Sequence, residues 1–282
     1  MLQPALKDDA FLADVKAAGR DADPFHLWWL GQSGFLVQWQ NRHLLLDPYL
    51  SDSLSNKYAH TDKPHVRMTE RVIEPERLDF IDVVTSSHQH TDHLDAETLS
   101  PLLRVNPHLV LVIPEANRDF VGERLEVDRD FPRGLEAGKS VTVMGFTIHG
   151  VPAAHNELEQ DEQGRHKFLG YVAQFGPWTI YHSGDTKHYP GMEDWLRRWR
   201  IDVALLPING DRPERRVAGN LDGREAATLA KRMGARLVMP CHYEMFEFNT
   251  ASPDEFVVTC QKLDQPYRVL RCAERWSSAE LK

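Results

Sequence analysis

Three histidines and one aspartate are concentrated in residues 88–93, which read His-Gln-His-Thr-Asp-His. Two serines separate this segment from residues 80–85, a run rich in Ile, Val and Thr that predicts a buried strand. A loop at the end of such a strand can direct several side chains toward one point. Neutral imidazole and carboxylate are ligands of zinc, manganese and iron, and a merely solvated turn would rarely hold four of them so closely. The sequence therefore predicts a metal site at this strand end.

One loop rarely supplies a complete metal site, so further ligands are expected after later strands. Three polar residues follow apolar, strand-like runs in this way, namely His155, Asp185 and His242. Loops on a rigid sheet are where a functional site recruits its side chains. These three residues are therefore the predicted partners of the 88–93 cluster.

The pattern His-x-His-x-Asp-His, followed by a later His, Asp and His, resembles the metallo-β-lactamase superfamily. The resemblance extends from about residue 28 to about residue 256 and includes Trp-Trp-Leu-Gly-Gln-Ser-Gly-Phe at 28–35. It implies a four-layer αββα sandwich. Several segments are similar to the branch that contains L-ascorbate-6-phosphate lactonase and N-acylphosphatidylethanolamine phospholipase D: 46–49, 94–95, 181–186, 206–210 and 240–244.

The resemblance also implies two divalent ions, zinc or manganese, with iron compatible as well. The first ion would be held by His88, His90 and His155, the second by Asp92, His93 and His242, and Asp185 would bridge them. Hydroxide formed at the two ions would be the nucleophile, with Asp92 and Asp185 as the catalytic carboxylates. Asp47 would accept a hydrogen bond from a metal-binding histidine and orient it. The ascorbate-phosphate lactonase has no clear histidine at the position of His155, so the fuller set points to a different enzyme of that branch.

Composition is typical of one soluble enzyme domain. A chain of 282 residues can bury about 75% of its unfolded surface, and no linker or repeat divides it, so residues 1–282 are predicted to form a single domain with a leader helix or extension at 1–24. Apolar runs shorter than a membrane span predict no stable membrane anchor, and three cysteines without disulfide or C-x-x-C spacing fit the cytoplasm. The formal net charge of −9 disfavours nucleic acid as a partner. Homo-oligomerisation stays open.

Patterning along the chain predicts alternating strands and helices. Residues 26–39 and 43–46 are expected to form a hairpin, and residues 48–78 a long polar loop. Further strands are predicted at about 80–86, 109–113, 140–149, 168–175, 178–182, 202–208, 235–240 and 267–271. Helices are predicted at about 94–103, 116–124, 191–199, 222–233 and 253–263.

Positive side chains suggest the kind of substrate. They are concentrated in the 51–70 loop and the 209–220 segment, and such groups would bind a phosphate or another anion, although charged loops are also commonly just solvated. The cations concerned are Lys57, Lys63, Arg67, Arg212, Arg215 and Arg216. Three residues beside predicted ligands or strand ends are expected to orient the substrate, namely Lys187, Asn209 and Tyr243.

The sequence thus predicts a metal-dependent hydrolase that cleaves a lactone, a phosphoester or a phosphodiester of a small anionic metabolite. Two alternatives remain open at this point. One is a lipid phosphodiesterase similar to N-acylphosphatidylethanolamine phospholipase D, which would need an apolar groove. The other is a non-catalytic metal-binding module, against which the complete set of ligand residues argues.

Overall fold

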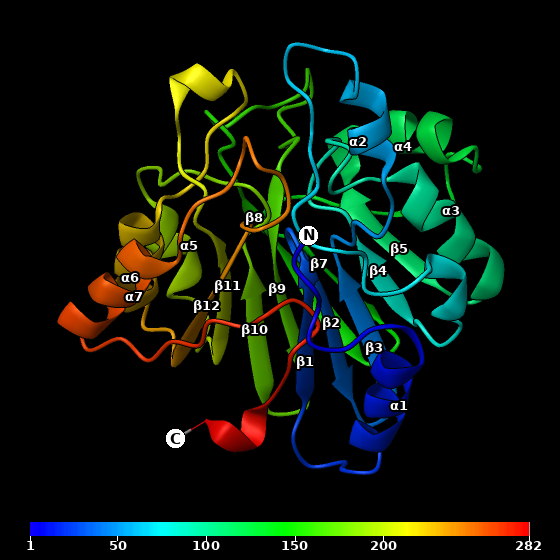
Figure 1. Cartoon of the computed structure of the whole chain (residues 1–282), viewed down its shortest axis with the longest axis horizontal. Helices are drawn as coiled ribbons and strands as arrows, with labels where there is room; N and C mark the ends of the chain where they lie inside the picture. The colour runs from blue at the N-terminus through cyan, green and yellow to red at the C-terminus, as the bar shows by residue number, and fades with distance from the viewer. Residues whose placement is uncertain (282) are drawn as a thin grey trace.

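Two mixed β-sheets form the centre of the molecule, whose computed structural model describes residues 1–281 (Figure 1). The first sheet has the strand order β13-β1-β2-β3-β4-β5-β6 and the second the order β12-β11-β10-β9-β8-β7. Strands of the first sheet are β1 (His26–Gly31), β2 (Gly34–Trp39), β3 (Arg42–Leu46), β4 (Val83–Thr85), β5 (Val110–Pro114), β6 (Arg133–Leu135) and β13 (Arg275–Ser277). Strands of the second are β7 (Ser140–Val143), β8 (Phe146–Pro152), β9 (Leu169–Phe175), β10 (Trp178–His182), β11 (Val203–Pro207) and β12 (Leu237–Cys241).

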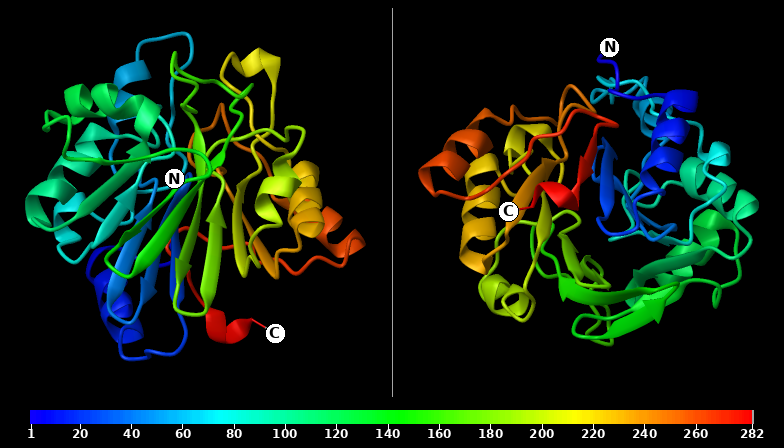
Figure 2. Two further views of the ribbon diagram at one scale, coloured as in Figure 1. Left: turned by 180° about the vertical axis from the view of Figure 1, so that it is seen from behind. Right: turned by 90° about the horizontal axis from the view of Figure 1, so that it is seen from below.

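Helices cover the outer faces of both sheets, as the view from below in Figure 2 shows. The first sheet is flanked by α1 (Asp8–Ala18), α3 (Ala96–Val105) and α4 (Arg118–Leu125). The second is flanked by α5 (Met192–Leu196), α6 (Gly223–Met233) and α7 (Asp254–Lys262). These layers confirm the predicted αββα sandwich. None of the helices within residues 1–281 is long and apolar enough to cross a bilayer.

Local sequence explains the helix boundaries and the packing. Helix α6 begins with a capping box, in which the Asp222 side chain accepts from the Glu225 backbone N–H while the Glu225 side chain accepts from the Asp222 backbone N–H. It ends at Gly234, whose φ of 76° closes the helix in the left-handed region. Between the sheets, the ring of Phe25 lies 5.3–5.6 Å from three other aromatic rings, those of Phe175, Trp178 and Trp276. This aromatic cluster joins the two sheets.

Three strand predictions were wrong in detail. Residues 26–39 form two strands instead of one, because a turn with positive φ at Gly31 and Gln32 reverses the chain. Residues 140–149 are divided into β7 and β8 by positive φ at Met144 and Gly145. The predicted strand at 267–271 makes just one bridge, between Tyr267 and Val238, and the strand that closes the first sheet is β13. The 48–78 loop contains a short helix, α2 (Ser53–Tyr58).

Strand directions place the predicted ligands at one edge of the sandwich. In the first sheet β3, β4 and β5 are parallel. In the second, β10, β11 and β12 are parallel, and β8 runs in the same direction because β9 is antiparallel to both β8 and β10. The loops after β4, β8, β10 and β12 carry the 88–93 cluster, His155, Asp185 and His242 respectively.

Candidate metal centre

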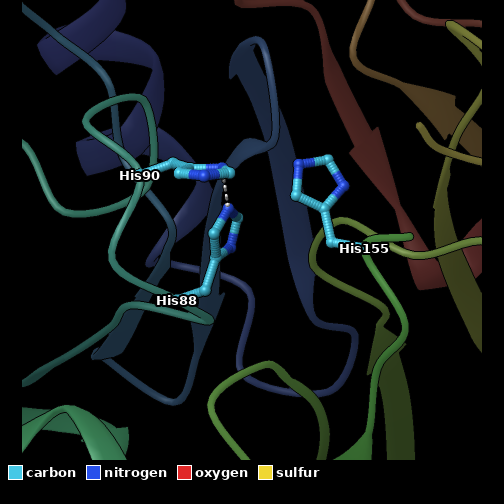
Figure 3. Close-up of side chains that lie close together, drawn as sticks. All are labelled: His88, His90 and His155. Atoms are coloured by element: carbon cyan, nitrogen blue, oxygen red, sulfur yellow. Dashed lines mark hydrogen bonds between the residues drawn. The ribbon is translucent and has the colours of Figure 1, made fainter. Parts of the chain in front are cut away.

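All seven predicted ligands converge at this edge. Their ligand atoms form three overlapping groups, each with its atoms within 4.8 Å of one another. The groups are His88, His90 and His155; His88, His93 and Asp185; and Asp92, His93 and His242. Figure 3 shows the first group: two imidazoles rise from the loop after β4, and the third approaches from the loop after β8. Two of these groups coincide with the two predicted ion sites.

Asp185 occupies the centre of the cluster. Its Oδ1 lies 3.3 Å from His93 Nε2, and its Oδ2 lies 3.2 Å from His242 Nε2 and 3.6 Å from His155 Nε2. The carboxylate therefore faces residues from both predicted ion sites. The residue before Asp185 must be small, because a Cβ at Gly184 would come within 2.6 Å of the Ser87 Cβ.

Spacing within the cluster fits divalent ions. Two ligand atoms bound tetrahedrally at about 2.1 Å from one ion would lie roughly 3.4 Å apart. The carboxylate–imidazole distances run from 3.2 to 3.7 Å. The buried Nε2 of His93 also has no hydrogen-bond partner among the described residues, and leaving such an atom unsatisfied is unfavourable without a ligand. The residues present therefore fit metal binding.

Hydrogen bonds at Nδ1 hold three of the histidines with Nε2 directed into the cluster, where His88 Nε2 lies 3.0 Å from His90 Nδ1 (Figure 3). His155 Nδ1 donates to the Gly219 carbonyl at 2.9 Å, and His93 Nδ1 donates to Asp47 Oδ2 at 2.7 Å. His88 Nδ1 lies 3.0 Å from the Ser87 hydroxyl oxygen, which accepts because its own proton goes to Asp47. Fixing Nδ1–H in this way sets the tautomer and directs Nε2 toward an ion.

The protonation states of the clustered histidines also favour cation binding. Burial lowers the pKa values of His88, His90 and His155, which keeps these imidazoles neutral, as a metal ligand must be. Burial opposes the charged form of His93 as well, but the carboxylates of Asp185 and Asp92 raise the pKa of His93 well above its usual value. A bound divalent cation would neutralise these two carboxylates in place of the proton on His93.

Asp47 supports the ligand loop with both carboxylate oxygens, as predicted from the resemblance. Oδ1 accepts from the Ser87 backbone N–H and from the Thr85 hydroxyl, each at 3.0 Å. Oδ2 accepts from His93 Nδ1 and from the Ser87 hydroxyl. Asp47 is fully buried and contacts the candidate ligand His93 without belonging to a ligand group itself.

We expect Asp47→Asn to weaken metal binding by about 10–100-fold. Asparagine tolerates the φ of +38° at this position. Its amide nitrogen is a donor, however, so it must face a group that now donates to Asp47. Chelator competition measures the affinity. Asp82→Asn is the matched control, since Asp82 accepts from the His43 backbone N–H and from Arg42, away from the cluster. Equal affinities of Asp47→Asn and wild type would contradict the orienting role.

Gln32, in the β1–β2 turn, is part of the site, although no pattern in the sequence predicts a role for it. Its Nε2 donates to Asp92 Oδ2 at 2.7 Å and lies 3.1 Å from His242 Nε2. The side chain is fully buried, and both Gln32 and His242 have left-handed backbones, with φ of 48° and 60°. Such conformations are uncommon for these residue types and are concentrated at functional sites.

A cavity of about 350 Å³ opens onto the cluster. Five of the predicted ligands line it, together with aromatic side chains and part of the 48–78 loop. Asn209 lies behind its wall and donates from Nδ2 to the Oδ1 of Asn249, which lines the cavity. The lining ligands are His90, Asp92, His155, Asp185 and His242.

Two residues expected to orient substrate lie away from this cavity wall. The Tyr243 hydroxyl donates to the Leu270 carbonyl at 2.8 Å, in the core. The Lys187 ammonium is paired with Asp211 at 2.5 Å. Neighbouring a ligand in sequence therefore does not bring these side chains to the cavity.

Of the six cations singled out in the two segments, Lys57 lines the cavity. Lys63 instead donates to the Arg216 carbonyl at 2.7 Å, and Arg67 is paired with Asp52 at 2.6 Å. Another cation, Arg124 of α4, lines the cavity although the sequence analysis did not single it out. The remaining three lie outside the cavity wall: Arg212, Arg215 and Arg216.

An αββα sandwich with clustered His and Asp side chains at one edge is the arrangement of the metallo-β-lactamase superfamily. The chain belongs to this superfamily: the profile of the family described as "Beta-lactamase superfamily domain" matches residues 26–242. The protein is thus a metal-dependent hydrolase of the metallo-β-lactamase superfamily.

Individual relatives agree with this assignment. A "UPF0173 metal-dependent hydrolase" of Caldivirga maquilingensis is 28% identical over 245 residues, which cover 86% of this chain and 93% of the relative. Among solved structures, the metallo hydrolase Igni18 of Ignicoccus hospitalis has a TM-score of 0.65 at 22% identity and covers 90% of this chain and 98% of its own. An isothiocyanate hydrolase from Delia radicum gut bacteria has a TM-score of 0.69 at 19% identity, covering 89% and 98%. At these identities the two structures show a shared fold.

Proposed function

We propose that the protein uses two divalent ions to hydrolyse a lactone, a phosphoester or a phosphodiester of a small anionic metabolite. The observation that carries the proposal is the convergence of seven ligand residues on one edge, beside a cavity of about 350 Å³. A cavity of this volume is at the small end of ligand sites and suits a metabolite better than a lipid.

Bound zinc, manganese or iron ions would lower the pKa of water and polarise the scissile carbonyl or phosphoryl group. The protein's own residues would arrange this chemistry. Asp185 faces ligands of both sites and would fix the ion separation, and Asp92, held by the Gln32 amide, would bind one ion and orient the attacking water. No serine or cysteine nucleophile is required.

Charge around the cavity supports an anionic substrate. Lys57 and Arg124 line it, and its acidic lining residues within the described chain are Asp92 and Asp185, both proposed ligands. Arg124 is held in place because its Nη1 donates to the Gln89 carbonyl at 2.7 Å and its guanidinium stacks on Phe120. A second anchor besides the ions would orient a flexible ester for attack.

We place the enzyme near the ascorbate-phosphate lactonase branch, with His155 completing a ligand set that the lactonase pattern lacks. His155 lies 3.6 Å from Asp185 and shares a group with His88 and His90, so it is positioned as a ligand. This difference supports an enzyme of the branch with its own substrate.

A substrate panel with metal-reconstituted protein tests the proposal. We expect hydrolysis of at least one anionic lactone, phosphomonoester or phosphodiester, and its loss with chelator. Turnover of long-chain phospholipids alone would favour the lipid phosphodiesterase alternative. Metal-loaded protein that cleaves none of these classes would overturn the proposal.

We expect Lys57→Ala to lower kcat/KM for an anionic substrate by about 10–100-fold, because a hydrogen bond to a charged group contributes roughly 1.5–3 kcal/mol. The matched neutral ester should be unaffected, since it offers no charge to Lys57. Lys63→Ala in the same loop is the control, as Lys63 contacts the Arg216 carbonyl instead of the cavity. Equal losses for both substrates would argue against anion recognition by Lys57.

A further inference from the structure

His65 is an imidazole of the 48–78 loop with no role in the proposed metal site. Its ring stacks on Tyr58, with centroids 4.2 Å apart, and meets Phe246 and Phe248 edge-on at 5.2 and 4.4 Å. The residue is 9% exposed. Three aromatic rings therefore hold the imidazole in one orientation.

The hydrogen bonds of His65 within residues 1–281 involve one of its two ring nitrogens. Nδ1 lies 3.1 Å from the Lys63 carbonyl, which can only accept, so Nδ1 carries the proton. In the neutral ring, Nε2 then has a lone pair available. His65 lines the same cavity as Asp92, Asp185 and the other lining ligands.

Few other groups in this cavity could move a proton near neutral pH. Besides the proposed ligands, its titratable lining residues within the described chain are Lys57, Tyr58, His65 and Arg124. Burial lowers the pKa of His65, as do the charges of Lys63 and Lys57, whereas the hydrogen bond to the Lys63 carbonyl and the charge of Asp92 oppose the shift. The imidazole is thus mostly neutral at neutral pH and able to accept a proton and return it.

We propose that His65 is a catalytic residue that delivers a proton to the leaving oxygen. The inference rests on the proposed hydrolase function. The water oxygen bonds to the acyl carbon or phosphorus, and the bond to the leaving oxygen breaks. The water loses its proton to solvent without needing His65 as its base. His65 Nε2 takes up a proton from solvent and gives it to the leaving oxygen, which regenerates the neutral imidazole. A positioned group of this kind contributes about 10²–10⁴-fold.

Leaving-group dependence tests the proposal. The substrates are the ethyl and 4-nitrophenyl esters of one acid, from the class that the wild type hydrolyses. We expect His65→Gln to lower kcat for the ethyl ester by about 10²–10⁴-fold, because ethoxide needs a proton to leave. For the 4-nitrophenyl ester we expect kcat to fall less than about threefold, because nitrophenolate leaves without a proton. His65→Phe, which retains an aromatic ring, should behave in the same way, and His60→Gln, at an exposed position of the same loop, should match the wild type.

Two measurements separate this role from a structural one. Metal content should be equal in wild type and His65→Gln, and two-bond ¹H–¹⁵N correlations should show the Nδ1–H tautomer of His65. Equal losses on both esters, or the Nε2–H tautomer, would overturn the assignment to His65 while leaving the hydrolase proposal intact. If the metal-loaded wild type hydrolyses neither ester nor any other member of the panel, both proposals fail.

Discussion

Asp185→Ala is expected to abolish turnover in a chain that remains folded. The two oxygens of Asp185 face His93 on one side and His155 and His242 on the other, so the variant removes the group shared by both proposed ion sites. Paired ions contribute several kcal/mol of transition-state stabilisation, which at 1.36 kcal/mol per factor of ten corresponds to about 10³-fold or more. The loss should appear in kcat more than in KM.

The control for this variant is Asp211→Ala, whose carboxylate is exposed and pairs with Lys187 instead of the ligands. It should retain wild-type kcat. Asp92→Ala should be nearly as damaging as Asp185→Ala, because Asp92 belongs to the ligand group with His93 and His242. Circular dichroism checks that each variant is folded. Activity of Asp185→Ala within tenfold of wild type under limiting metal would refute the two-ion account.

The convergence of the seven candidate ligands was predictable because their signal is local. The 88–93 cluster begins three residues after a strand of apolar, β-branched residues, and each later candidate follows a similar run. Parallel strands end at the same edge of a sheet, so residues distant in sequence meet once the strands pair. The αββα layers followed from the same alternation of strands and helices and from the family resemblance.

Other cavity residues were not predictable in this way because their partners are distant in sequence. Gln32 contacts Asp92, 60 positions away, and Arg124 reaches the cavity from a helix whose sequence shows no motif. His65 was one of several polar residues in a charged loop, and its distinguishing feature, the ring cage, depends on Phe246 and Phe248. Such pairings arise in tertiary structure and leave no spacing pattern.

Tyr243 illustrates the opposite error, in which closeness in sequence suggested closeness in the site. His242 has a φ of +60°, which turns the chain sharply after β12. The Tyr243 ring consequently stacks on Trp29, with centroids 4.4 Å apart, and its hydroxyl is bonded within the core. Backbone reversals of this kind are common at functional sites and cannot be read from strand periodicity.

We expect the purified, reconstituted protein to bind two divalent ions per chain, and chelation to abolish activity and lower Tm. Each ion present at about 100 times its Kd stabilises the folded state by roughly 2.7 kcal/mol. At about 2–4 °C per kcal/mol for a chain of this size class, one ion raises Tm by roughly 5–10 °C. Elemental analysis and thermal denaturation with and without chelator measure both effects.

Single-histidine variants determine whether the two sites are separate. His155 belongs to one ligand group and His242 to another, so His155→Ala and His242→Ala should each lose about one ion and part of the metal-dependent rise in Tm. His149→Ala is the control, because His149 bonds to Gln174 and belongs to none of the groups. Saturation of the wild type at one ion, with no effect of His155→Ala on metal content, would mean a mononuclear centre. Asp185 would then bind that one ion and would not bridge two. Asp185→Ala should in that case not disturb metal binding by both His155 and His242.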